Sequence, residues 1–383
     1  MIYEGNCRLG DLFQSRRERG RDGLPVLSVT MDDGLVVRSD LDRKQDTNLL
    51  PEEHLVVKAG DIAYNMMRMW QGAFGLSDQE GLVSPAYVVL KPTKSVDSKY
   101  AAYLFKTPKL LYLFRAYSYG LTDDRLRLYP KDFSRIPVNV PPRSVQSRIA
   151  NGLEHWERAI NVIDGLIRTT ETQRKHFTRR LLLQLDRLPG FSGKWNQVSV
   201  KDLGHVTSGG TPETDDASFW NGDIPWATPS DISAVLGRYI YNTERRLTAD
   251  GLAASSAKVM PPGTLLVCTR ATICELAISK VPMATNQGFK SLTPTSSYAA
   301  DFLYHLFRFY KKEFVRRACG STFLELSKRD FERMRFRVPK IEEQLAIAGA
   351  LNTFDDQIVA LRKQRTQISL ELDGLLNMLG MPA

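Results

Sequence analysis

Cysteine is scarce in this 383-residue chain, and its few cysteines are not arranged in pairs. Cys7, Cys268, Cys274 and Cys319 form no C-x-x-C motif, and no group of cysteine and histidine residues has the spacing of a zinc site. So few thiols favour a reducing compartment over a disulfide framework. No apolar run approaches the roughly 18 residues of a membrane span, and the first residues do not resemble a signal peptide. We therefore expect a cytoplasmic protein without a bound metal.

Catalytic signatures are missing as well. The sequence has no G-x-x-x-x-G-K-[ST] loop, no H-E-x-x-H or G-x-S-x-G motif, and no glycine-rich cofactor loop. It also lacks the [N/D]-P-P-[F/Y] tetrapeptide that amino-methyltransferases use. A nuclease-type carboxylate cluster has spacing too loose for the sequence to exclude. We expect a chain that is not itself an enzyme and holds no cofactor.

Basic residues, in contrast, are in excess. Lys and Arg together number 52 against 43 Asp and Glu, which gives a net charge of +9 and a pI of about 9.3. This balance favours a polyanionic partner such as nucleic acid. With 43% hydrophobic and 25% charged residues, the chain has the composition of a packed protein and is not mostly disordered. Its length allows two to three domains of roughly 100–200 residues.

The second half of the chain repeats the first at an offset of roughly 200 residues, too long a period for a solenoid and typical of an internal duplication. The matching positions keep the same order in both halves. They include Pro25 with Pro225, Gly60 with Gly263, Arg68 with Arg270, residues 84–87 with 286–289, Phe105 with Phe307, Phe114 with Phe314, Gly120 with Gly320, Phe133 with Phe331, Pro141 with Pro339, and Gln146 with Gln344.

Each half divides into a globule and a long helix. Residues 62–67, 86–90, 264–268 and 275–279 have the pattern of strands, and residues 100–117 and 301–318 have that of amphipathic helices. The predicted fold class is α/β (α+β), with two similar mixed globules separated by an intramolecular antiparallel coiled coil. The expected boundaries are 1–143 for the first recognition domain, 144–188 for the first helix, 189–340 for the second domain and 341–383 for the second helix.

Both long helices carry an apolar stripe with heptad spacing, and both follow prolines, which mark helix starts. A helix of about 40 residues is roughly 60 Å long, too long to bury its stripe on one globule. Two such helices bury their stripes on each other, and an antiparallel pair avoids leading the second globule back along the whole length. The predicted interface residues are Ile149, Leu153, Trp156, Ile160, Ile163, Ile167, Ile347, Leu351, Phe354, Ile358, Leu361, Ile368 and Leu372.

Polar residues recur at corresponding places in the two globules and suit DNA. Arg pairs bidentately with guanine, and Asn or Gln with adenine, while Ser, Thr and backbone N–H groups suit phosphates. The glycines of Gly209-Gly210-Thr211 would also allow a backbone to approach a phosphate closely. The candidate DNA-binding residues are Ser28, Thr30, Asn65, Arg68, Gln71, Ser84, Tyr87, Thr211, Thr228, Ser230, Asp231, Arg270, Thr272, Asn286, Gln287, Lys290, Ser321 and Thr322.

Four segments of the second half, 207–232, 261–278, 284–292 and 320–358, closely resemble the specificity subunit of type I restriction–modification systems, and the first half carries a weaker variant. The resemblance implies that each globule is a target recognition domain reading one half of a bipartite, asymmetric DNA site. It also implies that the helix pair separates the domains and docks two methyltransferase subunits. Cys274 departs from the family, which usually has glycine there.

The resemblance further implies which partners carry the chemistry. The modification subunits bind S-adenosylmethionine and methylate adenine, and restriction subunits, where present, use ATP and Mg to translocate and cleave double-stranded DNA. The chain itself is then non-catalytic and binds none of these cofactors. Two alternatives stay open at this point, namely a stand-alone methyltransferase or nuclease, and a coiled-coil adaptor that clamps proteins without binding DNA.

Overall fold

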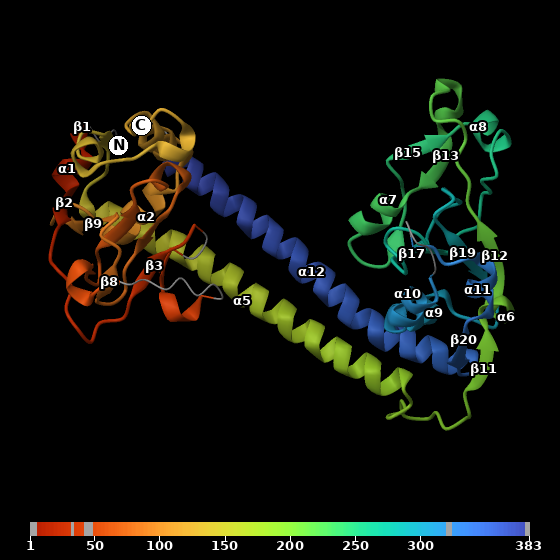
Figure 1. Cartoon of the computed structure of the whole chain (residues 1–383). Helices are drawn as coiled ribbons and strands as arrows, with labels where there is room; N and C mark the ends of the chain where they lie inside the picture. Colours follow the sequence, from red (N-terminus) through yellow and green to blue (C-terminus); the bar gives the residue numbers. More distant parts are fainter. Residues whose placement is uncertain (1–5, 32–33, 42–48, 319–323, 380–383) are drawn as a thin grey trace. The chain divides into compact units, whose positions relative to one another are not determined.

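The computed structural model describes residues 6–31, 34–41, 49–318 and 324–379. The chain forms two compact units, of which the first is Met1–Val162 with Arg365–Ala383 and the second is Ile163–Gln364. Each unit contains a mixed α/β body and part of two long helices, α5 (Arg143–Leu182) and α12 (Ile341–Leu379) (Figure 1). Among the described residues, no helix combines the length and apolar character needed to cross a membrane.

The first body is built on an antiparallel sheet with strand order β2-β9-β6-β7. The pairs β1–β10, β3–β4 and β5–β8 are also antiparallel. Its strands are β1 (Asn6–Arg8), β2 (Phe13–Arg16), β3 (Leu27–Val29), β4 (Leu35–Val37), β5 (Leu55–Val57), β6 (Ile62–Asn65), β7 (Phe74–Leu76), β8 (Gly81–Val83), β9 (Tyr87–Pro92) and β10 (Pro137–Asn139). Its helices are α1 (Leu9–Leu12), α2 (Ser98–Phe105), α3 (Pro108–Ala116) and α4 (Pro130–Phe133), with single 3₁₀ turns η1 (Arg38–Asp40), η2 (Pro51–Glu53), η3 (Met69–Gln71) and η4 (Asp123–Arg125).

The second body repeats this plan and adds to it. Its main sheet has the order β12-β19-β16-β17-β14, and a further sheet has the order β15-β13-β18, in which β13 and β18 are parallel. The strands are β11 (Asn196–Ser199), β12 (Gly204–Ser208), β13 (Trp220–Ala227), β14 (Tyr239–Ile240), β15 (Arg245–Leu247), β16 (Leu265–Val267), β17 (Leu276–Ser279), β18 (Ala284–Thr285), β19 (Lys290–Pro294) and β20 (Arg335–Val338). The helices are α6 (Val200–Leu203), α7 (Pro229–Ala234), α8 (Ala249–Ala253), α9 (Ala300–Phe309), α10 (Lys311–Arg317) and α11 (Lys328–Arg333), with a 3₁₀ turn η5 (Ala217–Phe219).

The expected amphipathic helix over 100–117 is in fact two helices, α2 and α3. Pro108 has no N–H to donate within a continuous helix, and the Thr107 side chain instead caps the start of α3 by accepting from the Leu110 N–H. The corresponding region of the second body is likewise divided, into α9 and α10 at Tyr310. The prediction of single helices was therefore wrong at both places.

Corresponding aromatic side chains form the centre of each body. In the first, the rings of Phe105, Phe114 and Phe133 have pairwise centroid separations of 5.3, 5.9 and 6.2 Å. In the second, Phe307, Phe314 and Phe331 form the same triad at 5.2, 6.1 and 6.1 Å. All six rings are almost completely buried. The internal duplication expected from the sequence is therefore present in the cores.

The turn glycines repeat as well. Gly60 and Gly263 have left-handed φ angles of +88° and +86°, which other residues adopt only at a cost. Each donates its N–H to a serine carbonyl, Gly60 to Ser77 at 2.8 Å and Gly263 to Ser279 at 2.7 Å. The two positions are thus equivalent in conformation and in hydrogen bonding.

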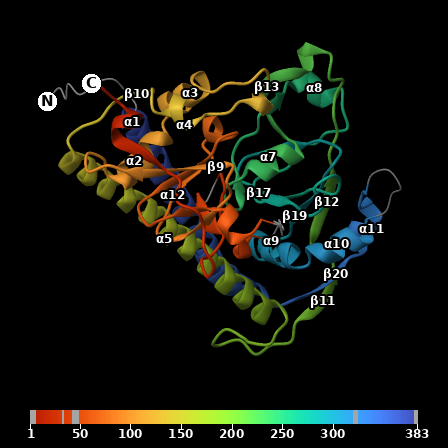
Figure 2. The same cartoon turned by 60° about the vertical axis from the view of Figure 1, so that its left-hand side comes forward.

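In the first unit, the start of α5 packs against the end of α12. Ile149, Leu153, Trp156 and Ile160 share one apolar cluster with Leu372. Figure 2 shows α2 beside α5, where Lys99 pairs with Glu154 at 2.9 Å. Because the beginning of one helix meets the end of the other, the two helices run antiparallel here.

In the second unit, the end of α5 packs against the start of α12. Ile347 and Leu351 join the core cluster that contains Leu181, and the rings of Phe177 and Phe354 lie 5.8 Å apart. The direction is again antiparallel, as the sequence predicted. The remaining predicted interface residues are all buried or half-buried: Ile163, Ile167, Ile358, Leu361 and Ile368.

The helix starts agree with their proline signals. α5 begins at Arg143 directly after Pro142, and α12 begins at Ile341, two residues after Pro339. α5 ends at Leu182, although the expected helix extended to residue 188. The chain turns instead at Gln184, which has a left-handed φ of +57°.

Candidate nucleic-acid interface

In the first unit, the loop that follows β6 collects three of the predicted DNA-binding residues. Asn65 ends the strand, and its Oδ1 accepts the Met67 N–H at 3.0 Å, which turns the chain. The Arg68 N–H then donates to the Asn65 carbonyl, and the Gln71 N–H to the Arg68 carbonyl, each at 3.0 Å. This ladder of short-range bonds leaves the side chains of Arg68 and Gln71 exposed on a firmly held backbone.

Ser84 and Tyr87 lie at the same end of the sheet. Tyr87 opens β9 and is the register partner of Asn65 across the β6–β9 pair. Ser84 precedes it in a turn in which Ser84 Oγ accepts the Ala86 N–H and the Ser84 carbonyl accepts the Tyr87 N–H. The structure therefore brings five predicted residues to one sheet end: Asn65, Arg68, Gln71, Ser84 and Tyr87.

Ser28 and Thr30 belong to the β3–β4 hairpin. Ser28 is only 7% exposed, and its Oγ accepts the Arg38 Nε–H at 3.0 Å. The Thr30 hydroxyl donates to the Gly34 carbonyl at 3.3 Å. Both side chains thus bond to residues in or directly after their own hairpin, whereas Arg68 and Gln71 are exposed.

In the second unit, two loops are joined by Thr211 and Gln287, because the Thr211 hydroxyl donates to Gln287 Oε1. The Gly210 N–H donates to the Thr285 carbonyl at 2.9 Å. At Gly209 a Cβ would overlap the carbonyl oxygens of Thr285 and Asn286, so a side chain cannot be accommodated there. Gly209 and Gly210 are themselves buried. The close approach they permit, which the sequence suggested for a phosphate, is an approach to the neighbouring loop.

Asn286 and Arg270 lie on adjoining segments of this surface. The Asn286 N–H donates to the Ala227 carbonyl at 3.0 Å, and its Oδ1 accepts the Gly288 N–H at 2.9 Å. A Cβ at Gly288 would lie 3.7 Å from the Arg270 Cβ, so the two backbones pass close together. Arg270 is half-buried, and its backbone bridges to Glu325. The segments that carry Arg270, Asn286, Gln287 and Thr211 therefore lie next to one another.

The turn after Arg270 contains two residues in the left-handed region. Ala271 and Cys274 both have a φ of +61°, a conformation that favours glycine. The resemblance implied glycine at the position of Cys274, and Cys274 adopts the left-handed conformation that glycine favours. Its thiol is buried, which raises the pKa to about 12, and it donates to the Phe307 carbonyl at 3.4 Å. Thr272 is exposed in the same turn.

Three further predicted residues lie at the start of α7. Thr228 caps the helix, and its hydroxyl donates to Asp231 Oδ2 at 2.5 Å. Asp231 also accepts the N–H groups of Thr228 and Glu244, each at 2.8 Å, whereas Ser230 is exposed. Thr228 and Asp231 therefore stabilise the helix start, and Ser230 is the member of the three that faces solvent.

Lys290 occupies a different kind of place. It is 7% exposed and lies 3.6 Å from Glu325 in an ion pair.

Ser321 and Thr322 lie outside the described residues. In the described part of the chain no cluster of histidine, cysteine and carboxylate residues could hold a metal ion.

The sequence interpretation missed a hairpin beside the first loop. Tyr119 and Arg127 exchange backbone hydrogen bonds at 3.0 and 2.9 Å, and between them Leu121 is 94% exposed. The Leu128 N–H donates to the Met66 carbonyl, which fixes the hairpin to the loop that carries Arg68. An isolated leucine among charged residues has no periodic pattern, so only its tertiary contact reveals the position.

Comparisons with known proteins show which family the chain resembles. A family model described as the Type I restriction modification DNA specificity domain matches residues 192–371. The specificity subunit of the type I restriction enzyme MjaIX from Methanocaldococcus jannaschii is 38% identical over 183 residues, which make up 46% of this chain and 42% of that protein. The EcoR124I/EcoR124II specificity subunit from Escherichia coli is 25% identical over 249 residues, or 61% of this chain and 59% of that protein. The alignments thus span less than two thirds of either relative.

Solved structures share the fold over nearly the whole chain. The S subunit of a type I restriction–modification system from M. genitalium covers 98% of this chain and 95% of its own, with a TM-score of 0.63 and 15% identity. A chain from a structure of a type I R-M system covers 98% and 97%, with a TM-score of 0.59 and 16% identity. At sequence identities this low, the structural similarity shows a shared fold only.

Proposed function

The chain belongs to the type I restriction modification DNA specificity family, and we propose that it is the DNA-recognition subunit of such a system. The observation that carries the proposal is the repetition of one polar surface in both units. In the first unit it comprises Asn65, Arg68 and Gln71, at and after the end of β6. In the second it comprises Arg270, which follows the corresponding strand β16, with Asn286 and Gln287, which follow β18. Arg, Asn and Gln are the side chains that read guanine and adenine edges.

The two surfaces differ in detail, and we propose that they read different half-sites. Asn65 and Arg68 are separated by a short hydrogen-bonded ladder, whereas Arg270 and Asn286 come from separate loops. Tyr87 in the first unit corresponds to Phe289 in the second, and the side chain of Phe289 is completely buried. A bipartite, asymmetric target is the simplest DNA site for two such unequal surfaces.

The wider assembly is part of the same proposal. Two methyltransferase subunits would bind S-adenosylmethionine and methylate adenine, and restriction subunits would use ATP and Mg. This chain would supply recognition and docking, as a non-catalytic member of its family does. The repeated polar surface favours this assignment over an adaptor without DNA contacts, because an adaptor needs no guanine- or adenine-reading side chains.

The decisive experiment maps modified bases in DNA from cells that carry this chain with its methyltransferase partner. We expect one bipartite motif with two unlike halves and adenine methylated in each. Deleting this chain while keeping the partner should remove the modification from every such site. A methylated motif that persists without this chain, or a partnered complex that shows no shift of random duplex at low salt, contradicts the proposal.

A further inference from the structure

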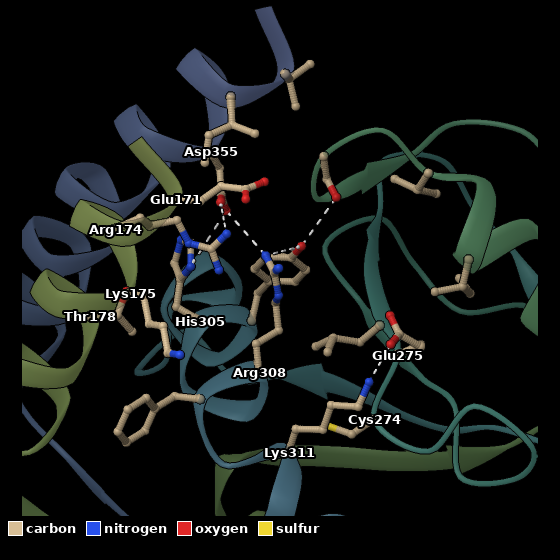
Figure 3. A pocket seen from close by; sticks show the side chains of 18 of the residues that line it. Glu171, Arg174, Lys175, Thr178, Cys274, Glu275, His305, Arg308, Lys311 and Asp355 are labelled. Carbon is tan, nitrogen blue, oxygen red and sulfur yellow. Dashed lines mark hydrogen bonds and ion pairs between the residues drawn. The ribbon is translucent and has the colours of Figure 1, made fainter. Parts of the chain in front are cut away.

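A polar cavity of about 700 Å³ lies within the second unit, between α5, α9 and α12 (Figure 3). Its volume is in the range of small-molecule sites. Arg174, Lys175 and Thr178 reach it from α5, His305 and Arg308 from α9, and Asp355 from α12. None of these six residues is a candidate DNA-binding residue, although Cys274, in the turn after Arg270, also lines the cavity.

Two buried oxygen atoms in the cavity lack hydrogen-bond partners. Asp355 is 6% exposed and Thr178 9% exposed, and neither Asp355 Oδ2 nor Thr178 Oγ1 has a hydrogen-bond partner among the described residues. A buried polar atom without a partner is costly, so such atoms are rare in folded proteins. Asp355 Oδ1 pairs with Arg174 at 2.9 Å, whereas Arg308 Nη1 lies 3.7 Å from Oδ2, beyond hydrogen-bond distance, so Oδ2 lacks a hydrogen-bond donor.

His305 adds a second acceptor next to Asp355. Asn352 Nδ2 donates to Asp301 at 3.2 Å, so the Asn352 Oδ1 faces His305 Nε2, and Nε2 must carry the proton of their 2.8 Å bond. Burial lowers the pKa of His305 to about 4, which leaves the ring neutral and Nδ1 unprotonated. Nδ1 and Asp355 Oδ2 lie 3.8 Å apart as two facing acceptors. One N–H-rich group, such as an amine, would satisfy both.

The mouth of the cavity favours an anionic group, whereas the buried acceptors favour a hydrogen-bond donor. Lys175 and Arg179 are exposed on α5 and line the cavity, and Arg308 lies at 3.7 Å from Asp355. The cations along the wall outnumber the carboxylates, so the site as a whole favours an anion. Lys and Arg are the usual partners of phosphate groups.

The duplicated unit shows that the fold does not require this polarity. In the first unit the position of His305 is taken by Tyr103, whose hydroxyl donates to Glu157 at 2.7 Å, the counterpart of Asp355. Leu372 and Leu376 stand where the second unit has Arg174 and Thr178, and both pack in the apolar core. Asp373 and Asn377 stand in the places of Lys175 and Arg179. The second unit thus has a shorter ring, a shorter carboxylate and two polar side chains where the first unit has a tyrosine, a glutamate and two core leucines.

We propose that this cavity binds a mononucleotide whose base carries an amino group, such as an adenine or cytosine nucleotide. The amino group donates to Asp355 Oδ2 and His305 Nδ1, a hydroxyl or ring atom meets Thr178 Oγ1, and the phosphate lies against Lys175 and Arg179. The ligand therefore pairs its donor end with the buried acceptors and its anionic end with the exposed cations.

The test is calorimetric titration of the full chain with matched ligands. AMP and CMP carry the amino group, and IMP and UMP are their counterparts with a carbonyl in its place. We expect AMP or CMP to bind at least tenfold more tightly than its deaminated counterpart, because a carbonyl would face two acceptors. We also expect inorganic phosphate to bind more weakly than the nucleotide. Absence of binding by both AMP and CMP, or equal affinity for the matched ligands, overturns the proposal.

Variants that place first-unit residues at the equivalent positions of the second unit test whether this cavity is the nucleotide-binding site. Thr178→Leu and Lys175→Asp introduce the residues of the equivalent positions, and each should weaken nucleotide binding at least tenfold. Lys175 is exposed, so Lys175→Asp is expected to fold normally even if Thr178→Leu disturbs packing. Arg148→Asp, at an exposed position of α5 outside the cavity, is the charge-matched control and should leave affinity unchanged. Unaltered affinity in Lys175→Asp would exclude this cavity as the site, whatever the outcome of the DNA experiments.

Discussion

Gln146 and Gln344 occupy equivalent positions at the starts of α5 and α12, and each makes the same three hydrogen bonds. The Gln146 amide donates to the carbonyls of Ser95 and Pro141 at 3.1 and 2.8 Å, and its Oε1 accepts the Asp97 N–H at 2.9 Å. Gln344 donates to Ser297 and Pro339 at 3.2 and 2.9 Å and accepts from Ala299 at 2.9 Å. Both side chains are completely buried, so each fixes the long helix to the body of its own unit.

Removing either glutamine should loosen the helix start that it holds. Gln344→Ala removes the side-chain partner of three backbone groups, those of Ser297, Ala299 and Pro339, and we expect a loss of about 2–4 kcal/mol in the stability of the second unit. Hydrogen exchange at residues 297–299 and in the first turns of α12 should accelerate, while the first unit stays protected. Gln14→Ala, at an exposed strand position, is the control. Equal exchange in Gln344→Ala and the unaltered chain would contradict this role.

The left-handed residue Ala271 predicts a stabilising substitution. Its φ of +61° costs an L-residue roughly 1 kcal/mol, and the side chain is exposed, so Ala271→Gly removes strain without losing buried contacts. We expect a gain of about 0.5–1 kcal/mol, measured by chemical unfolding. Ala253→Gly, in the short helix α8, should instead destabilise the chain.

Arg270 is expected to act in one half-site only. Its removal in Arg270→Ala should weaken binding to the cognate site by about 1–3 kcal/mol and relax the methylated motif in one half, because a bidentate base contact is lost. Modified-base sequencing measures this directly. Arg316→Ala, a highly exposed cation of the same unit, should leave the motif unchanged. A motif that is identical in Arg270→Ala shows that Arg270 does not read a base.

The length of the helix pair predicts the spacing of the DNA site. Seven residues added to both α5 and α12 would lengthen the pair by roughly 10 Å, since each helical residue rises 1.5 Å. This corresponds to about three base pairs at 3.4 Å each. We expect the spacer in the methylated motif to grow by that amount with both halves retained. An insertion variant that folds and methylates the original spacing refutes the idea of the helix pair as a spacer.

His305 predicts a pH dependence of stability. The folded-state pKa is about 4 because burial disfavours the charged ring, against 6.5 for the free side chain. Between these values the unfolded chain binds a proton that the folded chain does not, so stability falls as the pH decreases from 6.5 to 4. The loss should total about 3 kcal/mol and end below pH 4. Chemical unfolding of His305→Gln should lack this component, whereas His155→Gln, which changes an exposed histidine, should retain it.

The cores and the helix pair could be predicted from the sequence because they depend on repeated, local patterns. The apolar stripes place Leu153 and Leu351 in the interface through helical periodicity alone, and the offset between the halves pairs Phe105 with Phe307. The continuous helix over 100–117 was wrong because a single threonine–proline pair is enough to end one helix and start another. Helical periodicity averages over many residues, whereas a capping side chain such as Thr107 acts at a single position.

The candidate site was less accessible to prediction because side-chain roles there depend on distant partners. Thr228 and Asp231 are residue types that often contact DNA, but in the structure their hydroxyl and carboxylate cap the start of α7. Lys290 has the character of a surface cation and is buried beside Glu325, 35 residues further along the chain. Leu121 gave no sequence signal, since its position follows from a backbone bond between Leu128 and Met66.

The absence of a side chain at Gly209 has a consequence for how recognition can diversify. The segment ending at Thr211 and the segment around Asn286 touch backbone to backbone, so neither can change length or tilt without displacing the other. A change in the DNA sequence that this unit prefers would therefore require both segments to change together. Chimeras that exchange only one of the two should be selected against, and recombination within this unit is expected to favour breakpoints outside residues 209–288.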